Sequence, residues 1–398
     1  MEYYRIGEKM NAQDKIAEKL FLGILFVWLI YMNLYITTNF QPFLGGNIVL
    51  KSFSVLTIVL LAFKELISLK TNSISPIDYR KTITLILFVV LSISYVIHND
   101  GLISLSMIVL IVSSRNINIF SILKIFTIAE SIVLFITIIS SKIGLISTLY
   151  MPSDDGSLRS SLGFGYVSFA SHHAFFIICS YLIIRNKKIR YVELIFLLLL
   201  TFYLYKVTGT SSPFYLSLLA IFYDLLIEKI LKKKVIVNNR VLSFLTSMSF
   251  IIAFIIIIYF CTLASPQLVS TVDGVVHNRL HLSIEGMKSF GITAFGQKVN
   301  FITLDIFGNY SGQYNYIDSS YIQSLVVNGW IYTALIIYLF TYITKWAVSH
   351  RYELLAAFLV LAAIQGMFDP QMFVLWYSPF AIIIGKSFDS EVQSKWRN

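Results

Sequence analysis

Charge is scarce in this 398-residue chain, and cysteine is scarcer still. Charged side chains make up 13% of the residues and apolar ones 57%, and the mean hydropathy is +0.76. This balance excludes a soluble domain, because apolar runs of about 18 residues or more are typical of helices that cross a bilayer. The two cysteines, Cys179 and Cys261, both lie inside apolar runs. We therefore expect packing residues rather than a disulfide or a metal pair.

Motifs of nucleotide and metal chemistry are missing as well. The sequence contains no P-loop, no GxGxxG after a strand, no HExxH zinc motif and no DxD on the side predicted below to be cytoplasmic. ATP-driven and nucleotide-sugar chemistry are therefore disfavoured. We expect a protein that needs no cofactor and no metal.

The apolar runs predict an all-α polytopic membrane protein with about twelve transmembrane helices, in one integral-membrane domain over residues 1–398. No small-residue cleavage site follows the first run, so we expect a retained span rather than a signal peptide. The predicted spans are Leu20–Ile36, Val49–Leu69, Thr82–Ile97, Leu102–Ser114, Ile119–Ser140, Tyr166–Ile184, Tyr191–Val207, Pro213–Ile230, Val241–Leu263, Ser320–Ile343, Leu354–Phe368 and Phe373–Gly385.

The positive charges orient these spans. With the N-terminus in the cytoplasm and the spans alternating, 24 of the 31 Lys and Arg residues fall in cytoplasmic segments and seven outside. This bias is the rule for membrane proteins, so the net charge of +10 does not indicate nucleic acid. Both termini are predicted to be cytoplasmic. Two long loops, Ser141–Gly165 and Ala264–Asp318, are predicted to be extracytoplasmic, and loops of such length are usually functional or disordered.

The first outer loop carries an arginine that the charge bias does not explain. Arg159 lies in a glycine- and serine-rich approach to a helix, where a guanidinium can hold a diphosphate or a carboxylate through paired hydrogen bonds. Pairing with Asp154 or Asp155 at the lipid headgroups is the alternative, and the sequence leaves both open.

Three titratable residues within the predicted spans are weighed as candidates for function. His172 and His173 fall within the first two turns of the sixth span, and because adjacent residues cannot share a helix face, at most one points into a site. Glu130 lies near the middle of the fifth span, where carboxylates face inward and are candidates for function. For an enzyme that works at the outer face we favour a structural role for Glu130, paired with hydroxyl groups or with a lysine such as Lys51.

The second outer loop holds most of the remaining charge. Residues 276–290 predict a helix on the membrane surface, since an apolar and a polar stripe run side by side at helical spacing. The apolar stripe is Val276, Leu280, Ile284 and Met287, and the polar one is His277, His281, Glu285 and Lys288. We expect His281 and Lys288 to be solvated, whereas Arg279 flanks the apolar stripe and needs another partner for its charge.

Tyrosines and a carboxylate close this loop. Tyr310–Tyr316 is an aromatic cluster, which suits sugar rings but is also usual at membrane interfaces. Asp318 follows at the start of the tenth span.

The layout, with a long outer loop before the last few spans, is similar to that of the Wzy-type polysaccharide polymerases of bacteria, relatives of the O-antigen ligases. The local likeness lies in three stretches: Arg159–Tyr166, Asn278-Arg279 with the glycine turn at Gly296, and Asp318–Gly329. The chain departs from the family pattern at residues 170–173, where Pro-Asn is frequent, and at 208–213, where Ser-Arg is frequent. Whether Lys206 replaces that arginine stays open.

The resemblance implies an enzyme that joins undecaprenyl-diphosphate-linked oligosaccharide repeats at the outer face of the bacterial cytoplasmic membrane. The growing chain would pass from its reducing end to the next repeat, as in capsule or exopolysaccharide synthesis. Asp318, Arg279 and Arg159 would be catalytic, with His277 or His172 as a weaker candidate for the base. The substrate-binding residues would be Arg159, Arg279, Tyr321, His172, His277 and Gly296.

The partners implied are the lipid-linked oligosaccharide and membrane lipids, without nucleic acid, and flippase and chain-length regulator proteins stay open. Two other functions fit the sequence. A ligase of the same superfamily would pass the glycan to another acceptor. A lipid-linked oligosaccharide flippase would show internal repeats and midplane site residues, and neither is evident.

The orientation is testable by cysteine labelling of intact cells. A membrane-impermeant reagent should label Ser311→Cys and spare Lys233→Cys, because the first position lies outside and the second in the cytoplasm. Labelling of Lys233→Cys in intact cells would reverse the topology.

Overall fold

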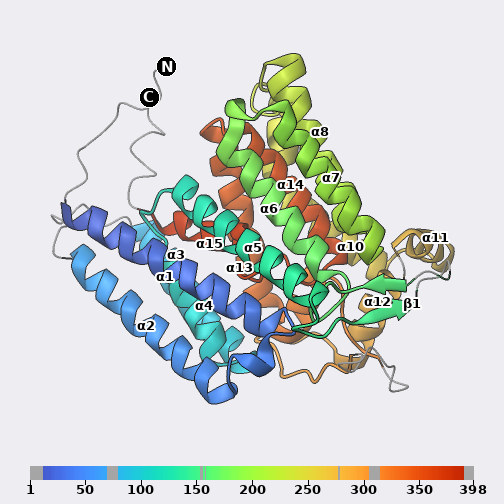
Figure 1. The fold of residues 1–398 in the computed structure, drawn as a ribbon, viewed down its shortest axis with the longest axis horizontal. Coiled ribbons are helices and arrows are strands. Elements are labelled where there is room, and N and C mark those ends of the chain that lie inside the picture. The colour runs from blue at the N-terminus through green and yellow to red at the C-terminus, as the bar shows by residue number, and fades with distance from the viewer. Residues whose placement is uncertain are drawn as a thin grey trace.

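The computed structural model describes residues 12–69, 79–152, 156, 158–276, 278–303 and 314–389. Within them two short strands, β1 (Tyr150–Pro152) and β2 (Leu158–Ser160), pair antiparallel, and helices make up the other regular elements (Figure 1). The all-α prediction is confirmed. The α-helices are α1 (Ala12–Ile36), α2 (Asn47–Leu69), α3 (Tyr79–His98), α4 (Leu102–Ser113), α5 (Ile119–Lys142), α6 (Phe169–Arg185), α7 (Tyr191–Thr208), α8 (Ser211–Asp224), α9 (Arg240–Ser247), α10 (Ser249–Thr262), α11 (Pro266–Val276), α12 (Arg279–Phe290), α13 (Ser320–Ser349), α14 (Glu353–Phe368) and α15 (Pro379–Ile383).

Six helices in the described part of the chain are long and apolar enough to cross a membrane: α1, α2, α3, α5, α7 and α13. The pair α9–α10, bent by 60°, would add a seventh span. Shorter apolar helices, among them α4, α6 and α14, occupy further predicted spans. A helical protein embedded in a membrane is supported, whereas the count of twelve spans stays a prediction.

Two of the long helices present apolar surface to the outside. Only 28% of the apolar window of α2 and 11% of that of α3 is buried against the rest of the chain. Their exposed side chains include Val55, Leu56, Val59, Phe63, Ile83, Ile86, Val90, Ile93 and Ile97. Apolar surface of this extent is unfavourable in water and favourable against acyl chains.

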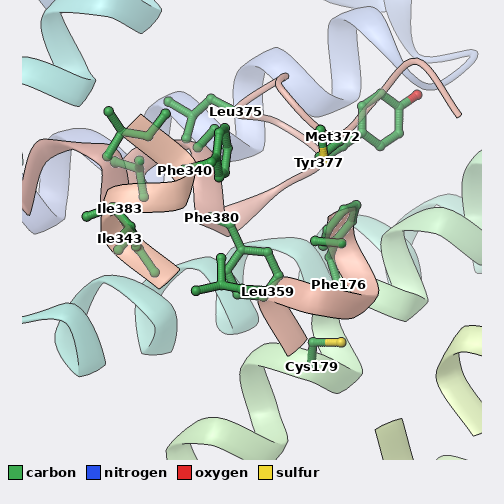
Figure 2. Close-up of a cluster of buried hydrophobic side chains, with 14 of the residues drawn as sticks. Phe176, Cys179, Phe340, Ile343, Leu359, Met372, Leu375, Tyr377, Phe380 and Ile383 are labelled. Carbon is green, nitrogen blue, oxygen red and sulfur yellow. The ribbon is translucent and has the colours of Figure 1, made fainter. Parts of the chain in front are cut away.

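The predicted loop residues gather at one end of the bundle. The β1–β2 hairpin, α11 and α12 lie together, far from the start of α1 (Figure 1). The intervening core is one cluster of buried apolar side chains, to which α6 contributes Phe176 and Cys179, α13 Phe340 and α14 Leu359 (Figure 2). Both cysteines are free, as predicted, and Cys179 is buried.

The surface helix predicted over residues 276–290 begins three residues late, as α12 (Arg279–Phe290), and a separate helix that was not predicted, α11, precedes it. Asn278 adopts a left-handed conformation (φ 63°) directly before α12 begins. Within α12 the predicted faces hold: Leu280 is buried, and His281, Glu285 and Lys288 are exposed.

The last predicted span is wrong in its first half. Residues 370–378 are not helical, and α15 begins only at Pro379. A proline is favoured at the first position of a helix and disfavours helical conformation in the residue before it, which explains the late start.

Two glycines fix the outer loop to α13. Gly329 breaks that helix with non-helical angles (φ 85°, ψ 162°), and Gly296 (φ 87°) crosses it there. Gln297 N donates to Val327 O (2.9 Å) and Trp330 N to Thr293 O (3.0 Å). A Cβ on Gly296 would lie 2.7 Å from the carbonyl carbon of Asn328, so the crossing admits no side chain. Broken helices at membrane depth need such partners for their freed backbone groups.

Glu130 has a different partner from the one predicted. Its fully buried carboxylate accepts from the Asn33 amide and lies 2.7 Å from His173 Nδ1, while Lys51 is exposed. His173 in turn stacks on Tyr377, with ring centroids 4.6 Å apart. The carboxylate therefore ties α1, α5 and α6 together, in keeping with a structural role.

Replacement of this carboxylate should lower stability more than activity. Glu130→Gln leaves one acceptor oxygen where two are used, so a buried donor loses its partner at a cost of about 1–3 kcal/mol. The measurement is the thermal unfolding midpoint and folded yield of the purified protein. Glu285→Gln, on an exposed side chain, is the matched control and should change little. Normal folding of Glu130→Gln together with lost activity would contradict the structural role.

Candidate active site

A cavity of about 680 Å³ lies among segments that the sequence predicts to be extracytoplasmic and the helix ends beside them. Its walls come from the end of α1, the β1–β2 hairpin, the start of α6, the α7–α8 turn, α12, the approach to α13 and the segment after α14. Arg159, Arg279 and Asp318 all line it, although they are far apart in sequence. Three of the predicted site residues are thus brought together.

Arg159 is held by a backbone turn. It sits on β2, and its Nε donates to Thr208 O at 2.8 Å. Gly209 follows in a left-handed conformation (φ 60°), and a Cβ there would lie 2.9 Å from that nitrogen. The turn therefore needs glycine so that the guanidinium can lie close to it. Among the described residues Arg159 forms no ion pair with a carboxylate, and Asp154 and Asp155 lie outside them.

Arg279 is positioned from two sides. The carboxylate of Asp273 accepts from the backbone N–H groups of Leu280 (2.8 Å) and His281 (3.1 Å), so it caps α12 where Arg279 begins the helix. The guanidinium Nη1 donates to Phe368 O at the end of α14 and lies 3.7 Å from Asp369 Oδ2. The partner expected from the sequence for the Arg279 charge is therefore the C-terminal end of α14.

Asp318 has the electrostatics of a base. Burial raises its pKa to about 6 although Arg279 and His172 act in the opposite direction, and Asp369 adds to the increase. A carboxylate with a pKa in this range is still ionised at neutral pH and binds a proton more strongly than an ordinary aspartate.

Aromatic side chains make up much of the remaining lining. They are Tyr166, Phe169, Tyr314, Tyr316, Trp376 and Tyr377. Burial raises the pKa of Tyr166, and it raises that of Tyr316 to about 12, so these phenols remain neutral donors and acceptors. Flat rings beside neutral hydroxyl groups suit the faces and edges of sugars.

Several predicted binding residues do not line the cavity. Tyr321 is fully buried, and its hydroxyl donates to Ala363 O at 3.1 Å, because it lies on the face of α13 that packs on α14. Gly296 lies against the backbone of α13 at the crossing described above, and not in the cavity lining. His172 lies behind the wall, 2.5 Å from Asp369 Oδ2, in a contact not aligned as a hydrogen bond. His277 lies outside the described residues.

Two acidic residues of the site are absent from the sequence-based prediction. Asp369 is buried and lines the cavity, and Asp273 caps α12. Asp369 follows α14 within a short connection. The one sequence signal that could have identified it as a site residue is its charge beside an apolar run. Asp273 precedes α12 at a distance in sequence too long for a usual cap.

The described residues contain no group of three His, Cys, Asp or Glu side chains that could hold a metal ion. The sequence matches no protein-family model, and it has no match among curated proteins or solved structures. The chemistry of the cavity is therefore the basis on which its function can be inferred.

Proposed function

We propose that the protein is a membrane glycosyltransferase of the Wzy type, a polymerase of undecaprenyl-diphosphate-linked oligosaccharide repeats. The observation that carries the proposal is the meeting of two arginines and a carboxylate of raised pKa in one cavity. Arginine binds phosphate oxygens through a planar fork, and a carboxylate can accept the proton of an attacking hydroxyl.

The reaction needs few groups. The hydroxyl oxygen of the incoming repeat bonds to the anomeric carbon of the growing chain while the bond from that carbon to the diphosphate oxygen breaks. Undecaprenyl diphosphate leaves with the electron pair, and Asp318 takes the hydroxyl proton. Arg159 and Arg279 stabilise the negative charge that grows on the leaving group. A single displacement inverts the anomeric centre.

Different parts of the cavity lining match different parts of this substrate. The aromatic lining suits sugar rings, and apolar residues such as Ile36, Leu282 and Val374 suit the prenyl chain near the diphosphate. The lining residues come from predicted outer loops and from the ends of predicted spans that adjoin them, which supports a site at the outer face and cytoplasmic termini.

A glycan profile tests the function directly. A strain that lacks the protein should accumulate single repeats on lipid if it is the polymerase. Long chains that stay unattached would instead identify a ligase, and repeats trapped in the cytoplasm would identify a flippase.

Both arginines should be intolerant of lysine. Arg159→Lys and Arg279→Lys keep the charge but lose the fork, and the loss of a charge-assisted contact in a shielded site costs about 3 kcal/mol, or roughly a hundredfold in rate. The measurement is polymer length and yield at matched protein levels. Lys298→Ala and Lys142→Ala are controls on exposed lysines and should cost little. Near-normal polymer from either arginine variant would exclude the diphosphate contact.

Activity should fall as the pH drops through about 6, the pKa to which burial raises Asp318, because the base must be ionised to accept a proton. Arg279 lowers this pKa and Asp369 raises it, so Arg279→Gln should move the midpoint to higher pH and Asp369→Asn to lower pH. The test is the pH profile of the initial rate of the purified enzyme. A profile that is flat between pH 5 and about 7, or that is unchanged in Asp318→Asn, would rule out Asp318 as the base.

A further inference from the structure

The segment after α14 carries buried polar atoms that lack partners. Asp369 Oδ1, Gln371 Oε1 and the Tyr377 hydroxyl are all buried, and none has a hydrogen-bond partner among the described residues. All three residues line the cavity. Buried polar groups are nearly always hydrogen-bonded, so these three atoms need partners, and because their residues line the cavity, water or a ligand bound there can supply them.

The segment is fixed in place rather than loose. Asp369 O accepts from Ser320 N (3.1 Å) and Ser320 Oγ (2.5 Å), and Met372 N donates to Ser320 Oγ at 3.2 Å. Met372 and Leu375 are inserted in the core, whereas the Tyr377 hydroxyl points away from that apolar cluster (Figure 2). Side chains of one short stretch thus divide between the core and the cavity.

The two carboxylate oxygens of Asp369 have different surroundings. His172 Nε2 lies 2.5 Å from Oδ2 without the alignment of a hydrogen bond, and Gln365 Nε2 lies 2.9 Å from His172 Nδ1. Arg279 also faces Oδ2, at 3.7 Å. Oδ2 is therefore close to two basic side chains, whereas Oδ1 has no hydrogen-bond partner among the described residues.

The chemistry of these atoms selects the ligand. A carboxylate oxygen and an amide oxygen both accept hydrogen bonds, and a phosphate has no hydrogen to donate to them at neutral pH, so these two atoms match a donor rather than the diphosphate. They need several neutral O–H donors close together, and Trp376 adds a flat ring to the same lining. A sugar ring has both features.

We infer that Asp369–Tyr377 forms a sugar-binding subsite, in which Asp369 Oδ1, Gln371 Oε1 and the Tyr377 hydroxyl hold hydroxyl groups of the glycan. The inference rests on the proposed function and assigns a specificity-determining role to residues that the reaction itself does not need. His172 acts as a positioning residue, since it touches Asp369 and not the cavity.

The test uses purified full-length protein in nanodiscs, with lipid-linked repeats extracted from a strain that lacks the protein. Tyr377→Phe and Gln371→Leu should raise the apparent KM for these repeats about five- to tenfold, because each removes one hydrogen bond to a neutral group, and should leave kcat within about twofold. Tyr338→Phe and Gln267→Leu, on exposed side chains, are the matched controls.

Two inhibitors separate the subsites. Pyrophosphate probes the arginines, so its inhibition constant should rise in Arg279→Lys and stay unchanged in Tyr377→Phe. The repeat oligosaccharide freed from lipid and phosphate probes the sugar subsite, and its inhibition constant should rise in Tyr377→Phe and Gln371→Leu. Unchanged pyrophosphate inhibition also shows that the variant cavity is folded.

The outcomes distinguish the two proposals. Wild-type protein that makes no polymer from the extracted repeats overturns the proposed function, and this inference with it. Polymer formation with an unchanged KM in both variants overturns the sugar subsite alone. Equal loss of pyrophosphate and oligosaccharide inhibition would mean a distorted cavity and would also contradict it.

Discussion

The end of α14 is the junction on which the geometry of the cavity depends. Phe368 O accepts a hydrogen bond from the Arg279 guanidinium, and Asp369 O accepts one from the Ser320 hydroxyl at the start of α13. The Asp369 carboxylate lies beside His172 of α6. Three elements distant in sequence are therefore tied to two consecutive residues. Because the last carbonyls of a helix have no partners within it, they are free to accept such donors, and the helix dipole favours a cation there.

Much of the helical layout follows from the sequence because hydropathy and length act locally. Most predicted spans, such as Ile119–Ser140, lie within a few residues of a helix. The exceptions are places where backbone geometry overrides hydropathy. Pro379 delays the last helix, and Asn278, in a left-handed conformation, delays the start of the surface helix.

The candidate site was predictable only in part. Arg159 and Arg279 stood out as outer charges that the distribution of lysine and arginine did not explain, and both line the cavity. Tyr321 belongs to the same sequence motif as Asp318, but it lies in the first turn of α13, on the face that packs against α14. The importance of Asp369 arises from tertiary contacts with α6, α12 and α13, which no local pattern in its short connection records.

The crossing of Gly296 and Gly329 has a consequence for the length of the chain before it. Only glycine fits at the crossing, and its neighbours are Phe295 and Gln297. Insertion of a single residue between Gly291 and Gly296 would shift the register and bring Phe295 against the backbone of α13, and a deletion would bring Gln297 there. The number of residues in this stretch is therefore fixed by the crossing. Substitutions within it are easier to accommodate than an insertion or a deletion.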